Sequence, residues 1–465
     1  MKKRLNLSET LAVGSMLFGL FFGAGNLIFP VFMGQAAGRN VWIAAIGFLV
    51  TAVSIPLLGV ASIGMSRSSS LLDMSSKVGK KYGVFFTCLL YLTIGPFFAI
   101  PRCASTSFSV GIRPNLTNES TASWAIWVFA FLFFAAVLWF SLRPGKILTW
   151  VGKVLTPLFL VSLAVLIVTA LIFPMGATSS VEPQSAYASS VFFKGFIEGY
   201  GTMDALASLA FGIVVIDTIR RLGVTEPGCI ATNTITSGIF GCVIMAVIYV
   251  MLAVVGAQSR VLYPMSADGG EALHLIATHY FKGTGGIILA VIVTLACLKT
   301  AVGLITSCSE MFCTIFPKGP TYKAWAVGFC VLSFLISTMG LSAIITWSLP
   351  VLMFLYPLSI TLILLALCGK LFKNDRVIYI SVTVFTLIAS VFDLVRTLPY
   401  KLPGQDPSAF GIPLELSQIP VLREIVDVGD MLPFAELGLG WVCPALVGLV
   451  IGVIWHIVRR STKKV

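Results

Sequence analysis

Long apolar runs, separated by short polar segments, fill almost the whole chain. A membrane-spanning helix needs about 20 largely apolar residues, and twelve stretches of the sequence approach or exceed that length. The alternation of apolar and polar residues that a transmembrane β-strand requires is nearly absent. The pattern therefore predicts an all-α integral membrane protein with twelve transmembrane helices. The predicted spans are residues 8–35, 41–64, 83–111, 122–142, 154–176, 192–219, 231–256, 285–313, 323–340, 343–369, 377–397 and 435–458.

The composition agrees with this pattern. Of the 465 residues, 57% are hydrophobic and 11% are charged, whereas roughly a quarter of the residues in a soluble domain are charged. So large an apolar surplus exceeds what soluble cores can bury, so part of it must face lipid. The ten cysteines lie mostly inside apolar runs and form no CxxC pair. We therefore predict neither a disulfide framework nor a metal cage.

The positive charges indicate how the chain is oriented. The lysine and arginine residues lie in loops between the apolar runs and do not form the single basic face of a nucleic-acid-binding protein. Twenty-one of them fall on one side of the predicted membrane and 8 on the other. Because Lys and Arg concentrate in cytoplasmic loops, both termini are expected in the cytoplasm. The polar segment 398–434 is then an extracellular connector.

Two spans contain residues that interrupt a helix. The first carries Gly19, Gly23 and Gly25, followed by Asn26 and Pro30. Glycine costs about 1 kcal/mol relative to alanine inside a helix. These residues therefore predict that the first span is unwound near its middle. The competing explanation for the glycines is that Gly19 and Gly23 allow another helix to pack closely against a continuous span.

The sixth span is interrupted in the same way. Glycines surround a group of polar residues there: Gly195, Gly199, Gly201 and Gly212 around Glu198, Thr202, Asp204 and Ser208. Interruptions at corresponding positions of two halves are typical of the central site of a secondary transporter. Exposed N–H groups of an unwound segment suit a carboxylate, and exposed C=O groups suit a cation. Spans 1 and 6 correspond if two five-helix halves repeat with inverted topology.

These residues also carry a family resemblance. The segments Phe22–Pro30 (FGAGNLIFP), Gly95–Ala99 (GPFFA), Arg143–Lys146 (RPGK) and Gly199–Asp204 (GYGTMD) occur in order along the chain. The sequence resembles the bacterial branched-chain amino acid:cation symporters, a family similar to the amino acid–polyamine–cation superfamily. The resemblance implies the leucine-transporter-like 5+5 inverted repeat with discontinuous helices 1 and 6, plus two C-terminal helices. The units would be 1–190 (helices 1–5), 191–370 (helices 6–10) and 371–465 (helices 11 and 12), in one transmembrane body.

The resemblance further implies import of leucine, isoleucine and valine with Na⁺ or H⁺, by alternating access across the bacterial cytoplasmic membrane. Amides near Ala24 and Gly25 would bind the substrate carboxylate, and carbonyls around Ala205 and Ser208 would accept its ammonium. Discrimination among the three substrates should be poor, since one methylene is worth about 1–3 kcal/mol. The implied substrate-binding residues are Gly23, Ala24, Gly25, Asn26, Phe97, Phe98, Ala205, Leu206, Ser208 and Phe211, with Leu209 as an alternative pocket residue.

The implied cation site departs from the family pattern at one residue. Carbonyls of Gly19 and Phe22 would face span 8, where Ala296 and Thr300 flank Lys299 at a position usually occupied by a hydroxyl residue. An intramembrane lysine is costly and therefore informative. Three alternatives remain open: its ammonium replaces sodium and makes transport proton-linked, it pairs with an acid such as Glu310, or it reaches an interface.

Other intramembrane charges include Asp204 and Arg102. Asp204 is the candidate proton carrier or gate partner, and Arg102 either lines the pathway or forms a structural ion pair. No cofactor is implied, and no metal beyond a possible Na⁺. The expected partners are the amino acid, the coupling cation and the lipid bilayer, with no nucleic acid and no protein partner.

Other functions fit the sequence less well. A carrier of another neutral amino acid with sodium-independent, proton-linked coupling is the main alternative. A membrane-embedded enzyme is disfavoured because His274 and His279 are five residues apart and do not share a helix face, and no GxSxG or P-loop motif occurs. A channel would need a repeated filter or a charged ring, and neither is visible.

Overall fold

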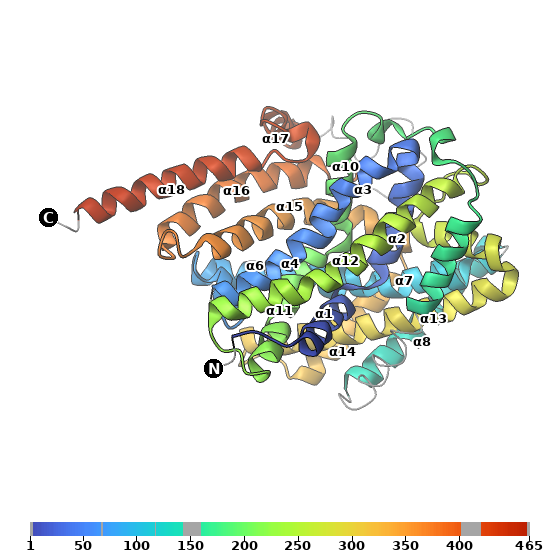
Figure 1. Ribbon diagram of the computed structural model, residues 1–465, viewed down its shortest axis with the longest axis horizontal. Helices are drawn as coiled ribbons and strands as arrows, with labels where there is room; N and C mark the ends of the chain where they lie inside the picture. The colour runs from blue at the N-terminus through green and yellow to red at the C-terminus, as the bar shows by residue number, and fades with distance from the viewer. Residues whose placement is uncertain (1–2, 67, 117, 143–159, 401–419, 463–465) are drawn as a thin grey trace.

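The structure, a computed structural model, is built almost entirely of helices (Figure 1). It describes residues 3–66, 68–116, 118–142, 160–400 and 420–462. The helices are α1 (Leu7–Phe21), α2 (Ala24–Ala37), α3 (Val41–Leu49), α4 (Ile55–Met65), α5 (Leu71–Ser75), α6 (Lys80–Leu92), α7 (Ala99–Gly111), α8 (Glu119–Ser141), the helix Leu160–Ile172, α10 (Val191–Glu198), α11 (Asp204–Arg221), α12 (Pro227–Ser259), α13 (Gly269–Ile315), α14 (Tyr322–Ser337), α15 (Leu341–Cys368), α16 (Arg376–Arg396), α17 (Pro420–Asp430) and α18 (Val442–Thr462).

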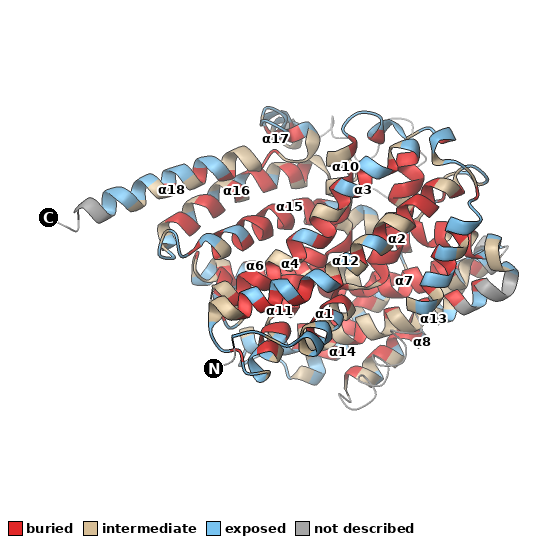
Figure 2. Ribbon diagram, viewed as in Figure 1, coloured by how far each residue is buried: buried red, intermediate tan, exposed pale blue. Residues whose placement is uncertain are grey.

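The helical membrane protein expected from the sequence is confirmed. Among the described residues, eight helical segments are long and apolar enough to cross a bilayer, or nine if α10 and α11, which meet at 45°, form one span. The same part of the chain contains the shorter apolar helices Leu7–Phe21, Leu160–Ile172 and Tyr322–Ser337. The count of twelve spans therefore stays a prediction. The outer helix α18 is largely exposed (Figure 2), including Trp455 and Ile454, as expected of a surface in contact with lipid.

Capping side chains fix several helix ends. Asn6 accepts the N–H of Glu9 at 2.8 Å, and Glu9 accepts the N–H of Asn6 at 2.9 Å, which starts α1. Asp375 accepts the N–H of Val377 at 3.0 Å at the start of α16 and lies 2.5 Å from Nδ1 of His456 on α18. The Val377 N–H and the imidazole both lower the pKa of Asp375. These contacts join α16 and α18 at one end.

Both predicted interruptions are confirmed. In the first span, α1 ends at Phe21 and α2 begins at Ala24. Phe22 and Gly23, which join the two helices, are in extended conformation. The sixth is divided into α10, the short 3₁₀ helix η7 (Gly199–Thr202) and α11, with Met203 in the left-handed region at φ 62°.

The structure also departs from the predicted helices. The third span is interrupted too, by a π-helical turn, η3 (Thr93–Phe97), in which Gly95 is non-helical. The predicted eighth span, 285–313, corresponds to the part of α13 that follows a kink at Lys282, where the apolar span covers Leu289–Ile315; before the kink, α13 begins at Gly269. Of the predicted connector 398–434, the described part includes α17, and 401–419 lie outside the described residues; so does the motif Arg143–Lys146.

Glycines allow α2 and α12 to approach very closely. A Cβ added at Gly34 on α2 would lie 1.9 Å from the carbonyl oxygen of Ala253, and one at Gly256 on α12 would lie 2.2 Å from that of Val31. Both contacts involve backbone atoms that cannot rotate away. The two helices are therefore held at a separation that excludes side chains, which fixes the second half of the interrupted first span.

Replacing Gly256 with alanine should lower thermal stability, because the added methyl group must push α2 away. Overpacking of this kind costs about 1–3 kcal/mol. The matched variant is Gly228→Ala on the same helix, where nothing lies within 4 Å of an added Cβ. That variant should keep or slightly raise the wild-type melting temperature. Thermal unfolding of both purified variants is the measurement, and equal melting temperatures would contradict the close approach.

Candidate functional site

The two interrupted helices meet through a buried polar contact. Nδ2 of Asn26, in the first turn of α2, donates to Oδ2 of Asp204, the first residue of α11, at 2.6 Å. Tyr249 on α12 donates its hydroxyl to the same carboxylate oxygen at 3.3 Å and also contacts Nδ2 of Asn26. Oδ1 of Asn26 accepts the N–H of Gly23 at 2.8 Å. Asn26 thus satisfies an N–H group freed by the first break and joins it to the second.

Arg102 crosses from the third span to the same place. Its Nη1 donates to the carbonyl oxygen of Gly201 in the unwound η7 segment at 2.6 Å. Its guanidinium carbon lies 5.1 Å from the ring centre of Phe29, within cation–π range. The residue is 3% exposed, and among the described residues its Nε has no hydrogen-bond partner. A Cβ at Gly25 would lie 2.7 Å from Nη2, so this arginine requires the glycine.

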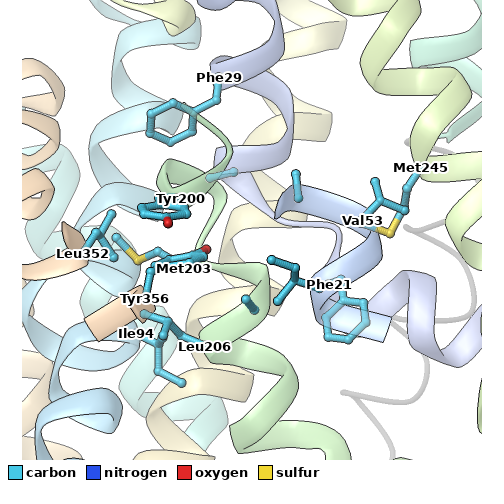
Figure 3. Close-up of a cluster of buried hydrophobic side chains, with 14 of the residues drawn as sticks. Phe21, Phe29, Val53, Ile94, Tyr200, Met203, Leu206, Met245, Leu352 and Tyr356 are labelled. Atoms are coloured by element: carbon cyan, nitrogen blue, oxygen red, sulfur yellow. The ribbon is translucent and has the colours of Figure 1, made fainter. Parts of the chain in front are cut away.

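Apolar side chains enclose the break in the sixth span (Figure 3). Tyr200 of η7 stacks on Tyr356 of α15, with ring centres 4.0 Å apart, and Met203 lies beside them. Figure 3 also shows Phe29 above this pair and Ile94 below it. The polar contacts of Asp204 and Arg102 therefore lie in surroundings from which bulk water is excluded, where electrostatic interactions are strong.

A small cavity of about 40 Å³ lies between the breaks. It has room for only a few water molecules, so a larger solute requires its walls to move apart. Its lining comes from spans 1, 3, 6 and 8: Leu20, Phe21, Gly23, Ala24, Gly25, Asn26, Ile94, Ala99, Arg102, Cys103, Thr202, Met203, Asp204, Ala207, Phe211, Thr300 and Leu304.

Several residues named from the sequence lie on this cavity and others do not. Those on its wall are Gly23, Ala24, Gly25, Asn26, Asp204, Phe211 and Thr300. Phe97 and Phe98 are half-buried outside the lining. Ala205, Leu206 and Ser208 are buried behind it, and Ser208 donates to the carbonyl oxygen of Ala205 at 2.7 Å. That carbonyl is therefore already engaged.

Some residues at the central cavity were not among those named from the sequence. From the third span, the cavity is lined by Ile94, Ala99 and Cys103 and not by the two phenylalanines. The π-helical turn changes which side chains of this span face the cavity. Tyr249 was also missed. The only sequence signal for it is a single tyrosine within the apolar stretch 238–257 of its helix.

The candidate cation site brings spans 1 and 8 together. Nζ of Lys299 lies 3.8 Å from the position of a Cβ at Gly19, and the methyl of Thr300 lies 3.4 Å from that of a Cβ at Gly23. Thr300 donates its hydroxyl to the carbonyl oxygen of Ala296 at 3.1 Å. Glu310 is eleven residues further along α13, about 16 Å along the axis. The ammonium of Lys299 thus lies near Gly19 of span 1.

Within the described ranges, no three His, Cys, Asp or Glu side chains converge closely enough to hold a metal ion. A cation near Gly19 and Phe22 would depend on carbonyl and hydroxyl oxygens.

Comparison with known proteins adds independent information. Residues 6–459 match the family model described as branched-chain amino acid transport protein. The chain is 49% identical over 447 residues to the branched-chain amino acid permease BrnQ of Lactobacillus delbrueckii subsp. lactis, covering 96% of each chain. It is 39% identical to the permease BrnQ of Bacillus subtilis (strain 168), covering 99% of this chain and 100% of that one.

Solved structures share the fold at low sequence identity. The closed, bromovinylhydantoin-bound form of Mhp1, a nucleobase-cation-symport-1 family transporter, matches with a TM-score of 0.58 at 14% identity, covering 96% of this chain and 92% of that one. The manganese transporter of Eremococcus coleocola matches with a TM-score of 0.58 at 11% identity, covering 97% and 95%.

Proposed function

The chain belongs to the branched-chain amino acid transport protein family, and from this premise we propose that it imports leucine, isoleucine and valine as a secondary active symporter. The relatives are named as permeases and carriers, so the protein is a transporter and not an enzyme. The observation that carries the proposal is the meeting of two broken helices, through Asn26 and Asp204, at a buried cavity. Broken helices of this kind hold the substrate sites of many transporters.

The proposed substrate position follows from the groups around the cavity. The carboxylate would bind the N–H groups at the start of α2, at Ala24 and Gly25, because a helix N-terminus favours an anion. Arg102 lies next to Gly25 and adds a positive charge. Ile94 and Phe211 offer apolar contacts to a branched side chain. Since the cavity is about 40 Å³, binding requires the halves of the first and sixth spans to separate.

The proposed topology extends the expectation from the sequence. Twelve spans would form two inverted five-helix halves, with α16 and α18 as the two additional helices and both termini in the cytoplasm. The family relatives are bacterial permeases, which favours the cytoplasmic membrane.

We propose that coupling is proton-linked and independent of sodium. Nζ of Lys299 lies beside Gly19, where the resemblance would place the coupling cation. A lysine ammonium is a compact charge with three donors, and it can exchange its proton when buried. While it is protonated, an ammonium in that position would repel Na⁺.

Uptake of labelled leucine into proteoliposomes tests substrate and coupling together. With the wild-type protein, an inward proton gradient should drive accumulation and a sodium gradient should not. Lys299→Thr should remove most of the proton-driven accumulation, by about tenfold or more, because it deletes the exchangeable charge. The matched variant Lys323→Thr, at an exposed lysine on α14, should behave as wild type.

The two parts of the proposal fail in different ways. Sodium-driven uptake by the wild type would contradict the role of Lys299 and would leave the symporter in place. Absence of leucine, isoleucine and valine uptake under both gradients would contradict the substrate.

A further inference from the structure

Two cysteine thiols from different spans meet beside the central cavity. Cys103 lies on α7 and Cys297 on α13. Both are free thiols, and they are 2% and 1% exposed. Their side chains are hydrogen-bonded to each other, and Cys297 is also hydrogen-bonded to Ser107, one turn further along α7. Cys297 therefore lies against the face of α7 that carries residues 103 and 107. We call Cys103 and Cys297 the thiol pair.

The packing of α7 on α13 holds the thiol pair in register. The two helices lie side by side (Figure 1). A Cβ added at Gly111 on α7 would lie 2.9 Å from the Cβ of Ala290 on α13. This contact is about two helical turns further along α7 from Cys103 and about two turns back along α13 from Cys297. The helices are thus antiparallel, and their closely packed backbones hold the two thiols opposite each other.

A small oxidant can reach the thiol pair through the central cavity. Cys103 forms part of the wall of this cavity, whose volume is about 40 Å³. The cavity has room for only a few water molecules. Hydrogen peroxide is one oxygen atom larger than water, so it fits where larger thiol reagents do not. The opening of the cavity during transport, which the proposed function requires, widens this route.

Arg102 gives the thiol pair a reactive environment. Its guanidinium interacts electrostatically with both Cys103 and Cys297. The thiolate is the form of cysteine that reacts with oxidants, and a neighbouring arginine promotes it. A buried cysteine in apolar surroundings is inert. The thiol pair differs from such a residue because a positive charge, a second thiol and a cavity occur together.

We propose that the thiol pair is an oxidation site, at which a hydroperoxide forms a reversible disulfide between Cys103 and Cys297. One thiolate attacks an oxygen of hydrogen peroxide, the O–O bond breaks, and the sulfur becomes a sulfenic acid. The second thiol attacks this sulfur, the S–O bond breaks, and the S–S bond forms as water leaves. The pair loses two electrons and two protons, and the peroxide takes up both to become two water molecules. A dithiol reductant reverses the reaction by thiol–disulfide exchange.

The disulfide would disturb the central site through Arg102. An S–S bond is about 2.05 Å long, shorter than the contact between two thiols, so its formation draws α7 toward α13 at Cys103. The preceding residue, Arg102, donates to the carbonyl oxygen of Gly201 at 2.6 Å. Displacement of such a group by about 1 Å can cost about 100-fold. Oxidation therefore inhibits leucine uptake, and reduction restores it. This effect rests on the proposed function, whereas formation of the disulfide does not.

Peroxide treatment of the full-length protein in proteoliposomes tests the proposal. After treatment, free thiols are blocked with N-ethylmaleimide, and mass spectrometry of a non-reduced digest detects a peptide linked through Cys103 and Cys297. The wild type should form this peptide and lose leucine uptake by about tenfold or more, and dithiothreitol should reverse both changes.

Two serine variants separate the thiol pair from other cysteines. Cys297→Ser keeps a hydrogen-bonding group of similar size, so it should transport like the untreated wild type and retain its uptake after peroxide. Cys308→Ser is the matched control. Cys308 is buried on the same helix, and its thiol donates to the carbonyl oxygen of Tyr91 at 3.4 Å. This variant should stay as sensitive to peroxide as the wild type.

Each outcome decides the question. Absence of the linked peptide, at peroxide concentrations that oxidise the exposed Cys368, would overturn the oxidation site. A linked peptide with full uptake would overturn its effect on transport. Equal inhibition of the wild type and Cys297→Ser would show that another group is responsible and would also overturn that effect. If the untreated wild type takes up no leucine, the proposed function fails, and the linked peptide still decides whether the disulfide forms.

Discussion

Replacing Gly25 with leucine should abolish leucine uptake while the protein still inserts into the membrane. A Cβ at this position would lie 2.7 Å from Nη2 and 3.2 Å from Cζ of Arg102. The guanidinium would have to leave the carbonyl oxygen of Gly201, and the new side chain would occupy a cavity of only about 40 Å³. Displacement of a binding group by about 1 Å can cost about 100-fold. We expect a loss of at least that size in proteoliposome uptake.

The control for this variant is a glycine with free space around it. Gly303 on α13 has no atom within 4 Å of an added Cβ, so Gly303→Leu should transport at nearly the wild-type rate. Equal amounts of both variants in the membrane fraction, with equal helical content by circular dichroism, would show that insertion is unaffected. Normal uptake by Gly25→Leu would remove Gly25 and Arg102 from the substrate pathway.

The interrupted helices could be predicted because their signal is local. Glycines next to polar residues, at the depth of a membrane centre, are unfavourable in a continuous helix. The sequence therefore predicts interruptions among the glycines of the first and sixth spans, with Asn26 and Asp204 beside them. Asn26 and Asp204 are 178 residues apart in the sequence, so no local pattern predicts their direct contact.

The third span shows why other residues could not be placed. The family resemblance implies Phe97 and Phe98 as pocket residues of this span. The π-helical turn at Thr93–Phe97 adds a residue to one turn and rotates the following helix, so Ala99 and Arg102 face the cavity instead. Gly95 and Pro96 are the residues that indicate such an irregularity, but their spacing does not give the angle of rotation. The environment of Lys299 could not be chosen from the sequence either. A lysine side chain is long enough to reach the cation site, an acidic partner or the membrane interface from the same backbone position.

Replacing Asp204 with asparagine should separate substrate binding from coupling. Asn keeps the size of the side chain and one oxygen that can accept from Nδ2 of Asn26, which lies 2.6 Å from the carboxylate. The contact between the two broken helices is thus retained, while the exchangeable proton and the negative charge next to Arg102 are lost. We expect gradient-driven accumulation of leucine to fall by about tenfold or more, since a buried acid in a transporter is usually part of the coupling machinery.

Exchange of labelled for unlabelled leucine across the liposome membrane, which needs no gradient, distinguishes coupling from structure. If Asp204 carries the coupling proton, Asp204→Asn should retain this exchange and lose the dependence of uptake on pH. Asp217→Asn is the matched control, because Asp217 lies on the same helix, is exposed and pairs with Arg220 at 3.1 Å; it should retain both activities. Loss of exchange together with accumulation in a folded Asp204→Asn protein would mean that the carboxylate orients Asn26 and the first break. Wild-type rates and an unchanged pH profile would make Asp204 a packing residue, and coupling would then have to rest on Lys299 alone.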